Sequence, residues 1–393
     1  MNIPFSPPDI TEEDIAEVTA VLRSGWITTG PKTAELEQAL SQFCQGQGVV
    51  CLNSATAALE LTLRLLQIGP GDEVITTAYT YTATAAAVLH TGAVPVLVDV
   101  APGSYLMDFQ QVAGAITSRT KAIIGVDVGG VMCDYPALIA LAKDTPFTPS
   151  GRMQEALGRP AVIADAAHSL GALWGKTPSG CAADFSCFSF HAVKNLTTAE
   201  GGAVTWRALP GVEDSEIRRL LRLYSLHGQS KDALEKSRVG SWEYDILIPG
   251  YKCNLTDVLA ALGVSQLRRY YTQLSYRRQM VSAYDTLLAG KVESMKHWGD
   301  NFMSSCHLYM VRVDPARRNA IIDQLARRGI SANVHYKPLP MLTAYRLLGY
   351  ELGQVPHSLK QYEGELSLPL HTLLTQRQVE YIARSLLDIL GNS

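Results

Sequence analysis

The chain has 393 residues, of which 47% are hydrophobic and 18% charged, and its formal net charge is −3. This length exceeds what a single hydrophobic core usually supports, so we expect two domains, residues 1–250 and 251–393. The charge balance gives no basic surface for nucleic acid, and no apolar run is long enough to span a membrane. The absence of a secretory signal pattern and of any CxxC pair among the seven cysteines predicts a cytoplasmic protein with reduced thiols and no metal site.

Apolar periodicity and turn residues predict alternating helices and strands. Helices are expected over residues 11–23, 33–44, 56–67, 82–91, 108–117, 135–143 and, as a short one, 153–157. Strands are expected over residues 48–52, 73–76, 94–98, 121–125, 161–164, 185–188 and 202–206. This alternation is typical of an α/β fold with a mostly parallel sheet covered by helices on both faces.

The pattern changes after Asn254. It predicts one long helix from residue 256 to about 289, a strand near 305–312, and helices over 315–328 and 375–390. Helices alternate here with few strands, which indicates a smaller α+β domain at the C-terminal end.

The first chemically suggestive segment is the turn Asn53–Thr56, which joins the expected strand 48–52 to the next helix. Small and hydroxyl residues at such a turn suit a phosphate, because a helix N-terminus offers unpaired N–H groups and a partial positive charge. The alternative is that Ser54 or Thr56 merely caps the helix.

Asp165 follows the apolar segment 161–164, which reads as a buried parallel strand. Ligands of open α/β sheets bind at the carboxyl edge of the strands. A carboxylate at that edge can pair with a cationic ring nitrogen, which a pyridoxal 5′-phosphate (PLP) enzyme requires. The alternative is that Asp165 caps a helix that begins there.

Lys194 lies between the expected strands 185–188 and 202–206. If the loop is buried, the ammonium loses hydration and its pKa falls, and a neutral amine can form an imine with a carbonyl. An arbitrary loop lysine lies on the surface. The turn Asn53–Thr56, which suits a phosphate, and the carboxylate of Asp165 favour a buried lysine.

These three segments, in this order, resemble the fold-type I PLP-dependent enzymes, and more narrowly the nucleotide-sugar aminotransferases of the DegT/StrS type. The resemblance covers nearly the whole chain and includes further segments at Ser24–Lys32, Pro70–Ile75, Tyr79–Thr84, Gly250–Asp257 and Val334–Tyr336. It implies a large PLP-binding α/β domain, residues 1–250, and a small C-terminal α+β domain, residues 251–393. The implied reaction moves an amino group from glutamate to a nucleotide-linked keto-sugar, for which we expect a UDP-4-keto sugar, in bacterial glycan or lipopolysaccharide precursor synthesis.

The resemblance also implies roles for individual residues. Lys194 binds the cofactor covalently and moves the proton, while Asp165 binds the pyridine nitrogen. Beside that cation we expect a lowered pKa for Asp165. His168 and Tyr81 hold the ring, Tyr81 by stacking on its face. The residues implied to hold the phosphate are Ala55, Thr56 and Ser189.

Further implied contacts involve the substrate and a second subunit. The substrate-side residues are Thr29, His335 and Tyr336. In the inter-subunit segment, Lys252 and Asn254 stand where many relatives have Asn and Arg. The resemblance implies a homodimer with shared active sites and leaves open which of the two reaches the neighbouring phosphate.

Two other functions fit parts of this pattern. Another fold-type I PLP enzyme is the first, but a sugar dehydratase would have His in place of Lys194, and no segment suggests the reactive cysteine of a desulfurase. The second is a PLP-binding regulator without turnover, which would carry an appended DNA-binding module. The chain has no length left for such a module, so transamination is favoured.

Overall fold

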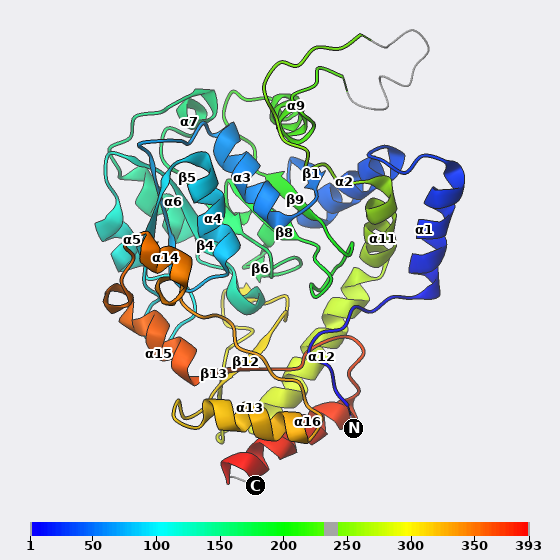
Figure 1. Ribbon diagram of the computed structural model, residues 1–393, viewed down its shortest axis with the longest axis vertical. Coiled ribbons are helices and arrows are strands. Elements are labelled where there is room, and N and C mark those ends of the chain that lie inside the picture. Colours follow the sequence, from blue (N-terminus) through cyan, green and yellow to red (C-terminus); the bar gives the residue numbers. More distant parts are fainter. Residues whose placement is uncertain (1, 232–242, 392–393) are drawn as a thin grey trace.

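A twisted seven-stranded sheet forms the centre of the computed structural model, which describes residues 2–231 and 243–391 (Figure 1). Its strands lie in the order β1-β9-β8-β5-β4-β2-β3. Their bounds are β1 Gly48–Leu52, β2 Glu73–Thr77, β3 Val94–Val98, β4 Thr120–Val126, β5 Ala161–Asp165, β8 Phe185–Ser189 and β9 Gly202–Trp206. Only β9 runs against its neighbours in this sheet, so the prediction of a mostly parallel sheet is confirmed.

Helices cover both faces of this sheet. One face packs against α3 (Ala55–Leu65), α4 (Thr82–Thr91), α7 (Arg152–Leu157) and α9 (Asp214–Ser225). The other packs against α2 (Pro31–Cys44), α5 (Phe109–Ala115), α6 (Tyr135–Lys143) and α11 (Asp257–Arg268). The central strands β2, β4, β5 and β8 are buried almost throughout because helices cover both faces, and apolar residues predominate in β4 and β5.

The C-terminal part has its own core (Figure 1). A three-stranded antiparallel sheet, in the order β10-β12-β13, packs there with three helices. These elements are α12 (Tyr270–Leu288), β10 (Glu293–Ser294), β12 (Tyr309–Arg312), α13 (Arg318–Arg327), β13 (Glu365–Leu368) and α16 (Gln376–Leu390). The expected strand near 305–312 and the helices near 315–328 and 375–390 are therefore confirmed.

The single helix expected over residues 256–289 is wrong, because two helices, α11 and α12, meet at Arg269. The backbone of Arg269 leaves the helical region there (φ −105°, ψ 5°). Its guanidinium donates to the Asp14 carboxylate at 2.7 Å and to the Asp9 carbonyl at 2.7 Å. Helix α11 packs on the large sheet, and α12 extends into the C-terminal core.

Shorter elements complete the chain. They are α1 (Glu12–Ser24), β6 (Leu173–Trp174), β7 (Thr177–Pro178), α8 (Ser179–Ala182), β11 (Phe302–Met303), α14 (Thr343–Leu347), α15 (Pro356–Gly364) and three 3-10 turns, Val128–Gly130, Leu339–Met341 and Leu352–Gln354. Contacts join residues on the two sides of the expected boundary near residue 250. Helix α11 packs on α1 and α2, and Ile3 forms a β-bridge with Ile330 in the C-terminal core. Within the described ranges, no helix is long and apolar enough to cross a membrane.

The start of α2 depends on a residue far away in the sequence. Its N-cap, Gly30, has no side chain to accept from the first turn, which leaves orphan N–H groups. The buried carboxylate of Asp257 accepts from the backbone N–H of Gly30 (2.8 Å), Lys32 (3.1 Å) and Thr33 (2.9 Å). It also accepts from the Thr33 hydroxyl at 2.8 Å. Asp257 therefore joins α11 to α2.

We expect Asp257→Ala to lower the free energy of unfolding by about 2–3 kcal/mol, because several buried donors lose a charged acceptor. Asp257→Asn is the matched control, since it keeps one acceptor oxygen and should lose less. The transition midpoint in urea measures both. An alanine variant as resistant to urea as the parent would show that Asp257 does not anchor α2.

Candidate active site

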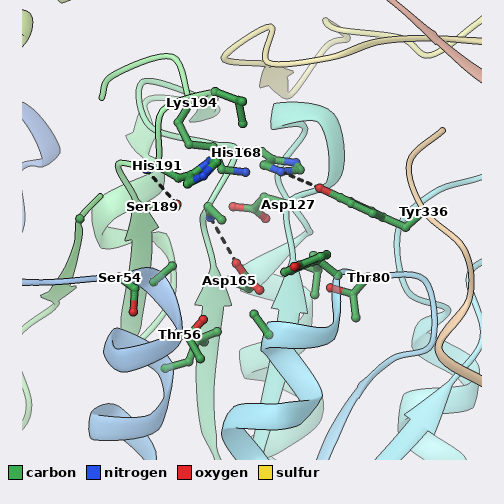
Figure 2. Close-up of a pocket in the computed structure, with 18 of the residues that line it drawn as sticks. Ser54, Thr56, Thr80, Asp127, Asp165, His168, Ser189, His191, Lys194 and Tyr336 are labelled. Carbon is green, nitrogen blue, oxygen red and sulfur yellow. Dashed lines mark hydrogen bonds between the residues drawn. The ribbon is translucent and has the colours of Figure 1, made fainter. Parts of the chain in front are cut away.

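A cavity of about 450 Å³ opens at the carboxyl edge of the large sheet (Figure 2). Asp165 comes from the end of β5, Ser189 from the end of β8, and Lys194 from the loop between β8 and β9. The N-terminal turn of α3 forms one side, and Tyr336 reaches in from the C-terminal part. The cavity thus lies where ligands of α/β sheets bind.

Lys194 is half-buried in the wall of this cavity. Its loop is held by the side chain of Asn195, which donates to the Ser305 carbonyl at 2.8 Å, and by a turn in which the Lys194 N–H donates to the His191 carbonyl at 2.9 Å. Burial lowers the pKa of Lys194 to about 8, although the charge of Asp165 acts to raise it. A substantial fraction of the amine is therefore neutral near pH 8, as a nucleophile requires.

Asp165 is a buried carboxylate with few donors of its own. The Thr84 hydroxyl donates to it at 2.7 Å and the Ala167 N–H at 3.3 Å. A turn follows it instead of a helix, so the helix-cap alternative is wrong. Burial raises the pKa of Asp165, opposed by these hydrogen bonds and by Lys194. The sequence predicts a lowered pKa for Asp165, but that lowering requires the cationic ring nitrogen of a bound cofactor against the carboxylate. In the protein alone the pKa is raised instead.

The start of α3 combines capping with an open anion site. Ser54 caps the helix by accepting from the Ala57 N–H at 3.1 Å, so the capping alternative holds for Ser54. Ala55 and Thr56 occupy the first turn, line the cavity, and carry N–H groups that a helix leaves unpaired. The start of α3 can lie this close to β9 only because residue 202 is glycine. A Cβ on Gly202 would lie 2.4 Å from the Ser54 carbonyl carbon and 2.6 Å from the Ala55 nitrogen.

His168, Tyr336 and Tyr81 meet on the opposite wall. The Tyr336 hydroxyl lies 3.0 Å from Nε2 of His168, and the Gly129 N–H donates to Nδ1 of the same ring at 3.2 Å. The Tyr81 ring lies 6.1 Å from that of Tyr336, and Tyr81 is 62% exposed at the mouth of the cavity. The sequence analysis places all three in the site, and the structure brings them together.

Four other candidate residues lie outside this cavity in the single chain. Nδ1 of His335 lies 2.8 Å from the Ser367 hydroxyl. The other three, Thr29, Lys252 and Asn254, line a second cavity of about 290 Å³. There Asn254 donates to the Thr29 hydroxyl at 2.6 Å and accepts from Lys252 at 2.5 Å.

The sequence analysis missed a second buried carboxylate at the cavity. Asp127 follows β4 and accepts from the hydroxyls of Ser169 and Tyr135, each at 2.6 Å, and from the Cys133 N–H at 3.0 Å. Burial raises its pKa to about 7, against these hydrogen bonds. An acidic residue just after an apolar strand was the available signal, the same one that identified Asp165. No cluster of three or more metal-ligating side chains occurs in the described part of the chain.

The fold and this cavity define the chain as a fold-type I PLP-dependent enzyme. Residues 8–387 match the family model of the DegT/DnrJ/EryC1/StrS aminotransferases. The chain therefore belongs to this family of PLP-dependent sugar aminotransferases.

Solved structures and a curated relative support this assignment. A Streptococcus pneumoniae protein assigned as a sugar aminotransferase, solved in a PLP form, is 49% identical with a TM-score of 0.96, covering 100% of this chain and 99% of its own. Helicobacter pylori PseC, an aminotransferase of pseudoaminic acid biosynthesis, is 29% identical with a TM-score of 0.86 and full coverage of both chains (100%). The spore coat polysaccharide biosynthesis protein SpsC of Bacillus subtilis is 35% identical over 98% of this chain and 97% of its own length.

The lowered pKa of Lys194 predicts how its acylation depends on pH. Only the neutral amine reacts, so labelling of the cofactor-free protein should rise with pH around a midpoint near 8, against 10.5 for an ordinary lysine. Peptide mass spectrometry measures this, with the exposed Lys176 as the internal reference for reagent reactivity.

The matched variant for this experiment is Asp165→Asn. Because the Asp165 charge raises the pKa of Lys194, its removal should move the midpoint to lower pH. A Lys194 profile centred near 10.5 in the parent would contradict the burial argument.

Proposed function

We propose that this sugar aminotransferase moves an amino group from glutamate to a nucleotide-linked keto-sugar, with a UDP-4-keto sugar as its substrate. The single observation that carries the transfer chemistry is the combination of Lys194 and Asp165 in one cavity beside the start of α3. Family membership supports the sugar. The UDP carrier, the keto group at C4 and the glutamate donor come from the resemblance in sequence.

The residues present fit PLP. The unpaired N–H groups at Ala55 and Thr56, with Ser189 opposite, suit its phosphate. The buried Asp165 has too few donors for its four lone-pair positions and suits the ring nitrogen. Lys194 would hold the aldehyde carbon, while Tyr81 would stack on the ring and His168 would lie at its edge.

When bound, PLP supplies an electron sink for the charge left on a substrate carbon that loses its proton. The Nζ atom of Lys194 would take that proton and hold it for return, because burial lowers its pKa to about 8 and leaves part of the amine neutral near that pH. Asp165, held by Thr84, would keep the proton on the ring nitrogen. The apolar lining of the cavity would exclude water during these transfers.

A sugar dehydratase on the same fold is the second candidate. Such relatives have histidine at the position of Lys194, which cannot carry out the same exchange of amino groups. Lys194 therefore favours transamination. Two relatives, SpsC of spore coat polysaccharide biosynthesis and PseC of pseudoaminic acid biosynthesis, support a role in bacterial glycan precursor synthesis.

We further propose a cytoplasmic homodimer in which each subunit completes its partner's site. Lys252 and Asn254 line a cavity separate from that of Lys194 in the single chain, which favours a role at the cofactor phosphate of another subunit. Exposed apolar side chains of Ile246, Leu247 and Tyr251 precede or adjoin them and suit burial against a partner. Thr29, His335 and Tyr336 would contact the sugar nucleotide.

The substrate is tested by a panel of nucleotide keto-sugars, each incubated with protein, PLP and glutamate. Mass spectrometry should reveal the amino-sugar from a UDP-4-keto sugar, together with 2-oxoglutarate. Lys194→Ala is the control and should form neither product. Amination of only dTDP- or GDP-linked sugars would overturn the UDP assignment, and loss of water without amination would favour the dehydratase.

The shared site is tested by mixing two inactive variants, Lys194→Ala and the double variant Lys252→Ala/Asn254→Ala. In hybrid dimers one site has both an intact Lys194 and an intact partner loop. Equal mixing makes half the dimers hybrid, so about a quarter of the parent activity should return. Mixtures that exchange subunits but stay inactive, with both variants folded, would contradict the proposal.

A further inference from the structure

The hydrogen bond between Tyr336 and His168 has a direction that their surroundings determine. Either group could donate across the 3.0 Å between the Tyr336 hydroxyl and Nε2 of His168. The backbone N–H of Gly129 points at Nδ1 of the same ring, 3.2 Å away. A backbone N–H can only donate, so Nδ1 must be the nitrogen without a hydrogen.

The ring of His168 is neutral, because burial lowers its pKa well below the ordinary value and nearby Lys194 and His335 lower it further. A neutral imidazole carries one hydrogen, and with Nδ1 excluded that hydrogen is on Nε2. Nε2–H therefore donates to the Tyr336 oxygen. The ring cannot turn freely to reverse this, since it packs 4.3 Å from the ring of His307, which is itself 3.0 Å from the Asn195 amide oxygen.

With its oxygen accepting from His168, Tyr336 keeps its own hydrogen for another acceptor. Among residues 2–231 and 243–391, no protein acceptor is found for it, and Tyr336 lines the cavity with Lys194 and Asp165. Burial raises the pKa of Tyr336, helped by the charge of Asp165, so the hydroxyl stays protonated. The free hydrogen is therefore available to whatever the cavity binds.

We propose that Tyr336 is a hydrogen-bond donor to an oxygen of the bound ligand, with its orientation set by the Gly129–His168 relay. The acceptor is an anionic or carbonyl oxygen, and PLP and both proposed substrates contain such oxygens. This inference deepens the proposed function and rests on it for the identity of the ligands. The direction of the relay can be tested on the protein alone.

The first test is nitrogen-15 NMR of the histidine rings in the full chain. The signals of His168, assigned by their loss in His168→Gln and by their shift in Tyr336→Phe, should show hydrogen on Nε2 and none on Nδ1. A ring with hydrogen on Nδ1, or on both nitrogens at neutral pH, would overturn the relay. This result does not depend on what the enzyme catalyses.

The second test is Tyr336→Phe, which removes the hydroxyl and keeps the ring. Dissociation constants are measured for PLP on the cofactor-free protein, and for glutamate and a UDP-4-keto-6-deoxy-N-acetylhexosamine on the loaded forms, together with the absorption maximum of bound PLP. At least one constant should rise roughly 10- to 100-fold, because the hydrogen bond involves a charged or strongly polarised oxygen.

The ligand whose affinity falls identifies the acceptor: a change for PLP and in its absorption indicates the cofactor, and a change for one substrate alone indicates that substrate. Tyr105→Phe is the matched control, since the buried Tyr105 hydroxyl has no hydrogen-bond partner among the described residues and Tyr105 is not part of the cavity wall that they form. It should leave all three constants unchanged. If Tyr336→Phe also leaves them and the absorption unchanged, Tyr336 is not a donor to the ligand.

Discussion

The burial of an amine and a carboxylate in one cavity is the constraint on which the rest of this structure depends. Taking Lys194 out of water lowers its pKa to about 8, and taking Asp165 out of water raises its pKa. Each charge partly offsets the shift of the other. Both groups are thereby left available for a ligand that carries a carbonyl and a cationic ring.

The fold keeps these groups in place with contacts from distant parts of the chain. Strands β5 and β8 are neighbours, so the residues at their carboxyl ends share one edge. The loop of Lys194 is tied to the C-terminal part through Asn195 and Ser305. Tyr336 lines the same cavity from that part. Both parts of the chain therefore contribute to the wall of the cavity or to the loop that carries Lys194.

The sequence predicts the central sheet well, because its strands are short runs rich in apolar and β-branched residues and turns separate them from the helices. Asp165 and Lys194 are recognisable for the same reason, since each follows a buried strand. The break at Arg269 cannot be predicted from the local sequence, because its partners Asp9 and Asp14 lie 260 and 255 positions away. Asp127 could have been found by the rule that identified Asp165.

Contacts between distant side chains were beyond sequence reasoning. The capping of α2 by Asp257 crosses more than 220 positions and leaves no periodic signal. The separation of Lys252 and Asn254 from the cavity of Lys194 likewise follows from tertiary structure alone. The direction of the His168 hydrogen bond requires the position of the Gly129 N–H, which lies 39 residues away in the chain.

The most direct test of the central claim is the site at which PLP attaches. Protein loaded with PLP is treated with borohydride, digested, and mapped by mass spectrometry. The reduced cofactor should be fixed on the peptide containing Lys194 and on no other. Label on a different lysine, or bound PLP that borohydride fixes nowhere, would contradict the central claim.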